Sequence, residues 1–176
     1  MSNAKHMVVL KCNGHSYFLP HKAARFSVLL SDLLDTDQSE GDKHCVVPVL
    51  HLTRQECAEF AMYMAHLLPK HARFKHVRDS ELARWASELF GLQPTHLHFQ
   101  KLVKLHHLFD FFNVPCVLAM IEAYIKVHTE GCETLDDMVN LWIGTKFEVA
   151  ALTPTQQHRV YTYLLHFHYN YKPNVE

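Results

Sequence analysis

The sequence predicts an α+β fold, with a small three-stranded sheet and its covering helices followed by two further helices near the C-terminus. Apolar residues alternate on both sides of an Asn13-Gly14 pair, which is the pattern of a β-hairpin. From residue 23 onward the apolar spacing changes to three or four residues, which is the spacing of helices. With 176 residues, 48% of them hydrophobic, the chain can bury a substantial core.

Residues 7–19 supply the predicted hairpin, since Asn and Gly readily adopt the positive φ angles of a two-residue turn. Residues 23–34 predict one or two short helices, and a polar loop containing glycine follows at 35–43. Residues 45–49 are rich in valine and predict a third strand. Pro48 indicates that this strand lies at the edge of the sheet, where a missing N–H is tolerated.

A capping box, Thr53 to Glu56, predicts the start of the next helix. Its expected inner face is Cys57, Phe60, Ala61, Met64 and Leu67 or Leu68. A basic loop then leads into a helix over residues 80–90. A longer helix follows, whose apolar stripe is Leu102, Leu105, Leu108, Phe109 and Phe112. Phe111 lies off this stripe and is expected to point away from the core.

Pro115 predicts the first turn of a second long helix, with an inner face of Val117, Ile121, Tyr124, Ile125 and His128. We expect this helix pair to form the centre of the core. Thr134 and Thr153-Pro154 mark two more helix starts. The last helix carries more apolar surface than one stripe requires, so it is either buried on several sides or offered to a partner.

The composition limits the class of protein but does not indicate a function. The formal net charge of −1 gives no overall attraction to nucleic acid or membrane, and no apolar run approaches the ~18 residues that span a bilayer. The five cysteines are scattered and include no C-x-x-C pair, which is typical of buried thiols in a reducing compartment. The sequence therefore predicts a soluble intracellular protein.

No catalytic or metal-binding pattern stands out. The 16 histidines lack the spacing of a metal site, and there is no nucleophile elbow, P-loop or dinucleotide fingerprint. Catalysis by a cysteine and a histidine stays open, because such partners meet in space rather than along the chain. The basic segment 70–84 has a single aromatic residue, Phe74, which favours a solvated loop over a nucleic-acid site. We therefore expect no cofactor and no bound metal.

The order of these elements resembles the BTB/POZ fold of the Skp-type adaptors (S-phase kinase-associated protein), the SCF ubiquitin ligase subunits that join a cullin to F-box proteins. The matching features are Val8-Val9-Leu10-Lys11 with Asn13-Gly14, Ala24 to Leu34, Val46-Val47-Pro48-Val49, Trp85 with Glu88, Asp110 to Val114, and Leu152-Thr153-Pro154. Elongin C is similar but ends near the central helix pair, so the helices from Thr134 onward favour the Skp type. The resemblance implies a BTB/POZ domain over 7–129 and F-box-binding helices over 130–171.

The resemblance implies a non-catalytic adaptor that works in ubiquitin-dependent degradation in the cytoplasm and nucleus. Asp110 and Phe111 stand where the family carries an Asn-Tyr pair that touches the cullin. The implied F-box contacts are Trp142, Val160, Tyr161, Leu164 and Leu165. Taken singly, Trp142 and the last aromatics are more typical of a core. Pro154 matches a proline that some protist members hydroxylate and glycosylate.

The chain also departs from the family. Its loop at 70–84 is basic and its tail is aromatic, where the family usually carries acidic residues at both places. An alternative function is a POZ scaffold that associates with itself or serves as a kinetochore-type subunit, without ligase work. The implied partners are a cullin and F-box proteins, with a homodimer when no F-box protein is bound, and neither nucleic acid nor membrane.

Overall fold

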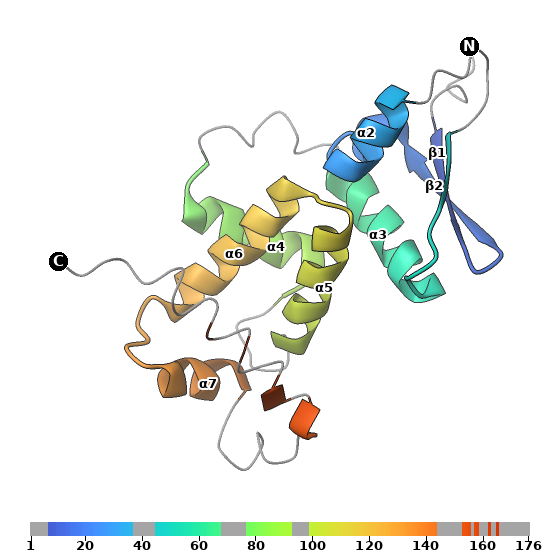
Figure 1. Ribbon diagram of the computed structural model, residues 1–176. Helices are drawn as coiled ribbons and strands as arrows, with labels where there is room; N and C mark the ends of the chain where they lie inside the picture. The colour runs from blue at the N-terminus through green and yellow to red at the C-terminus, as the bar shows by residue number, and fades with distance from the viewer. Residues whose placement is uncertain are drawn as a thin grey trace. The chain divides into compact units, whose positions relative to one another are not determined.

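The computed structural model describes residues 7–36, 45–67, 77–92 and 99–143, together with 153–155, 157, 158, 162 and 165 (Figure 1). Within these residues the protein is α+β, as predicted, with three strands and helices α1 to α7. The chain forms two compact units. Unit 1 comprises Met1–Val77 and His107–Ala119, and unit 2 comprises Arg78–His106 and Met120–Glu176. This division differs from the predicted domains 7–129 and 130–171, because helices α5 and α6 each contribute to both units.

The sheet of unit 1 has the strand order β2-β1-β3. Strands β1 (Met7–Cys12) and β2 (His15–Pro20) form the predicted antiparallel hairpin. Asn13 and Gly14 have φ angles of 47° and 79°, as the turn requires. Strand β3 (Cys45–Pro48) pairs parallel with β1 and forms an edge of the sheet, which confirms the prediction from Pro48.

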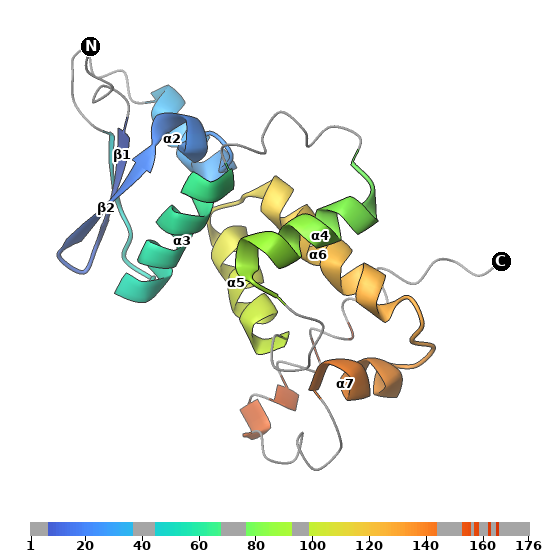
Figure 2. The same cartoon turned by 180° about the vertical axis from the view of Figure 1, so that it is seen from behind.

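The helices of unit 1 are α1 (His21–Ala24), α2 (Val28–Thr36) and α3 (Arg54–Leu67). Figure 2 shows α2 and α3 on the same side of the sheet. The predicted capping box starts α3: Thr53 N and Oγ1 donate to Glu56 Oε2 at 2.7 and 2.8 Å, and Glu56 N donates to Thr53 Oγ1 at 3.2 Å. Most of the expected inner face of α3 is buried.

Two details of α3 differ from the expectation. Ala61 is only half-buried, whereas Tyr63, which was not assigned to the inner face, is buried. The Tyr63 ring lies 6.3 Å from that of Phe109, so the apolar side of α3 is wider than one stripe. The predicted Leu68 lies outside the described residues.

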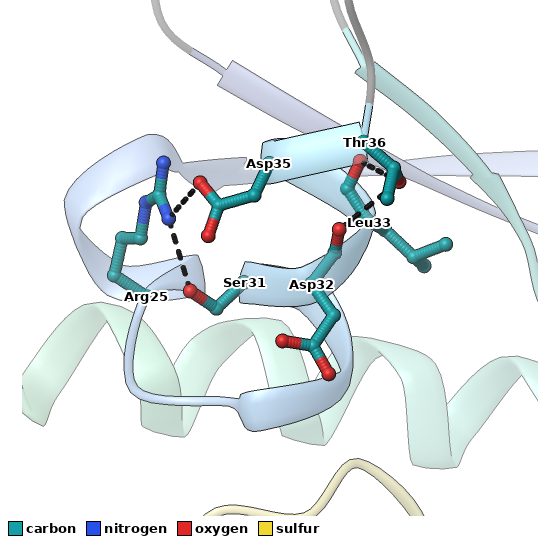
Figure 3. Close-up of polar contacts among 6 residues, drawn as sticks. All are labelled: Arg25, Ser31, Asp32, Leu33, Asp35 and Thr36. Atoms are coloured by element: carbon teal, nitrogen blue, oxygen red, sulfur yellow. Dashed lines mark hydrogen bonds and ion pairs between the residues drawn. The ribbon is translucent and has the colours of Figure 1, made fainter.

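The surface of α2 is held by short polar contacts (Figure 3). The Arg25 guanidinium donates from Nη1 to Asp35 Oδ1 at 2.6 Å and to Ser31 Oγ at 3.0 Å. At the helix end, Thr36 Oγ1 lies 3.0 Å from the carbonyl oxygens of both Asp32 and Leu33. These contacts are exposed and stabilise the helix only modestly.

Unit 2 contains α4 (Asp79–Phe90), most of α5 (Phe99–Phe111) and of α6 (Pro115–Thr129), and α7 (Leu135–Ile143). Gly91 ends α4 at a φ of 61°, and the Leu92 N–H donates to the Ser87 carbonyl at 3.0 Å. Lys126 Nζ lies 2.5 Å from Asp79 Oδ2 and forms an ion pair. No described helix is long and apolar enough to cross a membrane.

The core of unit 2 includes an aromatic cluster of four rings, namely Phe99, Tyr124, His128 and Trp142. The ring centroids of Tyr124 and His128 lie 4.2 Å apart, and Trp142 lies 5.8 to 6.0 Å from the other three rings. Within the described structure, the Tyr124 hydroxyl and Trp142 Nε1 are buried without a hydrogen-bond partner. Burial raises the pKa of the Tyr124 phenol, which keeps the hydroxyl neutral.

Candidate functional site

The candidate site in unit 1 is the turn that ends α5, which carries Asp110 and Phe111. Asn113 adopts a left-handed conformation with a φ of 49° and stops the helix. Its N–H donates to the Asp110 carbonyl at 2.9 Å, and the Val114 N–H donates to the Phe109 carbonyl at 3.0 Å. This pair of bonds is a Schellman motif, which satisfies carbonyls that a helix end otherwise leaves open.

The start of α2 anchors this turn. Ser27 is fully buried and precedes the first residue of α2. Its hydroxyl accepts a hydrogen bond from Leu30 N at 3.0 Å, as an N-cap does, and donates to the Phe112 carbonyl at 2.5 Å. The Val28 N–H donates to the Asn113 carbonyl at 2.8 Å. Two hydrogen bonds therefore tie segments about 85 residues apart, and Ser27 uses its hydroxyl both as donor and as acceptor.

The aromatic residues of the turn divide into an inner and an outer set. Phe112 is buried and stacks on Phe60 of α3, with ring centroids 3.7 Å apart, and Phe109 lies 5.6 Å from the same ring. Phe111 is 41% exposed, as its position off the apolar stripe predicts. Its ring meets Phe112 edge to face, with centroids 5.1 Å apart. An aromatic side chain is thus presented to solvent from a backbone that is fixed on both sides.

Asp110 places an exposed carboxylate beside Phe111. A projecting aromatic ring next to a charge, on a backbone that loses little freedom on binding, is well suited to protein recognition. The two neighbouring residues that the resemblance assigns to cullin binding are therefore both exposed on this turn.

The residues assigned to F-box binding have different surroundings. Trp142 is only 2% exposed and lies in the aromatic cluster of unit 2, which is a core position in this structure. Leu165 is 36% exposed. Val160, Tyr161 and Leu164 lie outside the described residues. The predicted F-box surface thus keeps Leu165 as its described member.

Pro154 is exposed and helical, and the Gln157 N–H donates to the carbonyl of Thr153 at 2.9 Å. This is the helix start that Thr153-Pro154 predicts. The Pro154 ring is therefore accessible to a modifying enzyme. Whether it is modified stays a prediction.

The described cysteines and potential metal ligands were predicted to form no site, and their surroundings are as follows. All five cysteines are free, Cys12 and Cys57 being buried and the other three half-buried. Burial raises the pKa of the Cys116 thiol to about 11, and burial with hydrogen bonding to Cys12 raises the pKa of the Cys57 thiol to about 12. Both thiols are protonated at neutral pH. In the described ranges, no group of three potential ligands could hold a metal ion.

Sequence reasoning missed the role of Ser27. The local signal was available, since a serine directly before an apolar run is a common N-cap. The second bond of Ser27, to the Phe112 carbonyl, joins distant segments and has no local signal.

The chain was also compared with models of protein families, with curated proteins and with solved structures, and none of them matches it.

Proposed function

We propose that the protein is a non-catalytic adaptor subunit of an SCF-type (cullin–RING) ubiquitin ligase, with Asp110 and Phe111 on its cullin-binding surface. The observation that supports this most is the exposed Phe111 ring on a turn fixed by a Schellman motif and by Ser27. The α+β architecture, with a hairpin and a parallel third strand, is compatible with the expected fold. F-box proteins would bind the C-terminal region, of which Leu165 is exposed.

The Phe111 ring would insert into an apolar pocket of the cullin, with the Asp110 carboxylate beside it at the rim. Replacing an exposed aromatic anchor by a charged residue removes the buried contact and places an unpaired charge in the interface. Because Phe111 is half in solvent, the same replacement leaves the helix end and the Phe60–Phe112 stack in place.

The test is affinity purification of the full chain carrying Phe111→Asp, with Met62→Asp as the matched control. Met62 is also an exposed apolar residue of unit 1, on α3. We expect the Phe111 variant to lose at least nine-tenths of the co-purified cullin while F-box proteins are retained, and the Met62 variant to keep both. Equal cullin recovery from both variants would contradict the assignment.

A second candidate is a scaffold that associates with itself through unit 1. It is favoured by the exposed apolar side chains of α2, namely Val28, Leu29 and Leu33. Analytical ultracentrifugation separates the two. An adaptor binds added cullin, whether alone it is a monomer or the homodimer that the resemblance implies. A scaffold binds no cullin and forms concentration-dependent oligomers, which Leu33→Asp returns to the monomer.

A further inference from the structure

The solvent-facing side of the three-stranded sheet of unit 1 is unusually apolar. Successive side chains on a strand point to opposite faces. Val8, Leu10, Leu19 and Val47 are buried on the inner face. The opposite side, which we call the outer sheet face, carries Met7, Val9 and Lys11 from β1, Ser16, Phe18 and Pro20 from β2, and Val46 and Pro48 from β3.

The strand register gathers the apolar side chains of the outer sheet face into one row. Val9 pairs with Phe18 on one side and with Val46 on the other. Phe18 is 58% exposed and Val46 is 48% exposed, and they flank Val9, which is nearly covered. Met7 pairs with Pro20 in the neighbouring row. Along the strands of a sheet with one exposed face, apolar residues on the buried face normally alternate with polar residues on the exposed face. This continuous apolar surface therefore indicates an interaction site.

No described helix of unit 1 covers this face. Helices α2 and α3 lie on the other side of the sheet in both views (Figures 1 and 2). Helix α3 packs against β1 and β2 there. Next to the row, at the free edge of β3, lies a hollow of about 230 Å³ lined by Leu33, Thr36, Cys45, Val46, Val47 and Pro48. Val46 and Pro48 belong to both, so the hollow adjoins the outer sheet face at the edge of β3, and Leu33 and Thr36 of α2 form its other side.

The size of the outer sheet face bears on what it can bind. Three strands at ~4.8 Å spacing, each contributing residues over ~13 to 20 Å, give roughly 200–300 Å² on one partner. A stable protein–protein interface needs about 800 Å² on each partner, so two copies joined through this face alone would not form a lasting dimer. A single amphipathic helix, ~10 Å across, matches the area.

An added strand fits this surface less well than a helix does. The sheet has two edges. Strand β3 is only four residues long and its Pro48 has no N–H to offer, and strand β2 on the other side ends at Pro20, which has none either. Lys11 is the charged residue of the outer sheet face. It lies in the row next to that of Val9, where it pairs with Ser16 on one side and with Pro48 on the other. Its ammonium has no ion pair within the described part of the chain. A bound helix would therefore gain affinity from an acidic side chain placed beside Lys11.

We propose that the outer sheet face binds an amphipathic helix of another protein. The helix lays apolar side chains, spaced at i, i+3 or i+4 and i+7, over the row of Phe18, Val9 and Val46, and places an Asp or Glu above Lys11. One large apolar side chain at its edge enters the hollow beside β3. This surface is independent of Asp110 and Phe111, so it can operate whether or not the protein binds a cullin.

The test is photo-crosslinking of the full chain, in cells that produce it, through p-benzoylphenylalanine at position 18. Position 62 carries the same group as a control. We expect an adduct at position 18 whose partner peptide shows helical apolar spacing and an acidic residue. A synthetic peptide of that segment should bind the purified chain in fluorescence anisotropy, with affinity weakened at least tenfold by Phe18→Asp and at least threefold by Lys11→Glu.

Exchanging the acidic residue of the peptide for lysine should recover most of the affinity lost in Lys11→Glu, and Met62→Asp should leave binding unchanged. Circular dichroism confirms that each variant is folded. The proposal is overturned by an adduct with a second copy of the chain, with another segment of the same chain or with a non-helical segment. It is equally overturned when position 18 gives no more adduct than position 62, or when Phe18→Asp binds the peptide normally.

Discussion

The two units differ in how many large apolar side chains they expose. Among the described residues, all exposed large apolar side chains except Leu141 and Leu165 lie in unit 1, on its sheet, on α2, on α3 and at Leu50 and Phe111. Both units also enclose large side chains, such as Phe60 and Phe112 in unit 1 and Trp142 and Tyr124 in unit 2. In the described part of the chain, unit 1 therefore carries most of the exposed large apolar side chains.

The units also differ in whether their buried polar side chains have hydrogen-bond partners. In unit 1 the buried Ser27 hydroxyl has both of its hydrogen bonds. In unit 2, as far as it is described, the Tyr124 hydroxyl and Trp142 Nε1 have none. A buried polar group without a partner costs about 1–3 kcal/mol. The aromatic cluster must offset this cost through the area it buries, whereas hydrogen bonds from Ser27 and Val28 hold the turn that ends α5 in unit 1.

The largest expected effect is that of Trp142→Ala. Removing the indole leaves a cavity among Phe99, Tyr124 and His128, and should lower the free energy of unfolding by about 3–5 kcal/mol. Urea denaturation followed by circular dichroism measures it. The neighbouring Leu141→Ala, at an exposed position of the same helix, should change stability by less than about 0.5 kcal/mol. If the Trp142 variant loses no more than the Leu141 variant, the indole belongs to a partner surface after all.

A smaller effect is expected for Ser27→Ala. The variant loses the N-cap of α2, worth about 1 kcal/mol, and leaves the Phe112 carbonyl without its donor. Together these should lower the free energy of unfolding by about 2 kcal/mol, and hydrogen exchange should speed up at Leu30. Ser31→Ala, which removes only an exposed contact to Arg25, is the control and should be near neutral. Similar losses in both variants would show that Ser27 does not hold the turn.

The smallest effect concerns the cap of α7. Thr134 N and Oγ1 donate to Asp137 Oδ2 at 2.8 and 2.7 Å, and Asp137 N donates to Thr134 Oγ1 at 3.2 Å, repeating the capping box of α3 in unit 1. These bonds lower the pKa of the Asp137 carboxyl from its ordinary 3.8. The stabilisation is therefore complete above pH 3.8 and is lost as the pH falls through the lowered pKa.

Amide exchange of Thr134 measured by NMR against pH tests this. Protection should decline only below pH 3.8, and Asp137→Asn should abolish the dependence while Asp136→Asn preserves it. An unchanged pH profile in Asp137→Asn would assign the protection to another group.

Features encoded by neighbouring residues were predictable from the sequence. The Asn13-Gly14 turn, the Thr53–Glu56 capping box and the stripe from Leu102 to Phe112 each depend on a few residues close in the chain, and the structure confirms all three. The exposure of Phe111 followed from the same helical periodicity. Local hydrogen bonding and helix geometry decide such features, so one sequence suffices.

Features that join distant segments were not predictable. The bond from Ser27 to the Phe112 carbonyl and the packing of Trp142 against Phe99 require knowledge of which elements meet. The apolar row on the outer sheet face depends on the parallel register of β3 with β1, which the separate strand patterns do not contain. The sequence therefore suggested Asp110 and Phe111 as the candidate site, but it did not indicate which residues hold this turn in place.

Because α5 and α6 run through both units, neither unit is a continuous stretch of chain. A fragment ending at Val77 would lack Phe109 and Phe112, the two rings that pack on Phe60. Limited proteolysis in the segment before α4 should for this reason release no folded piece, and the cut halves should stay associated until both denature. A truncated form of this protein that is meant to fold must therefore include α5 and α6.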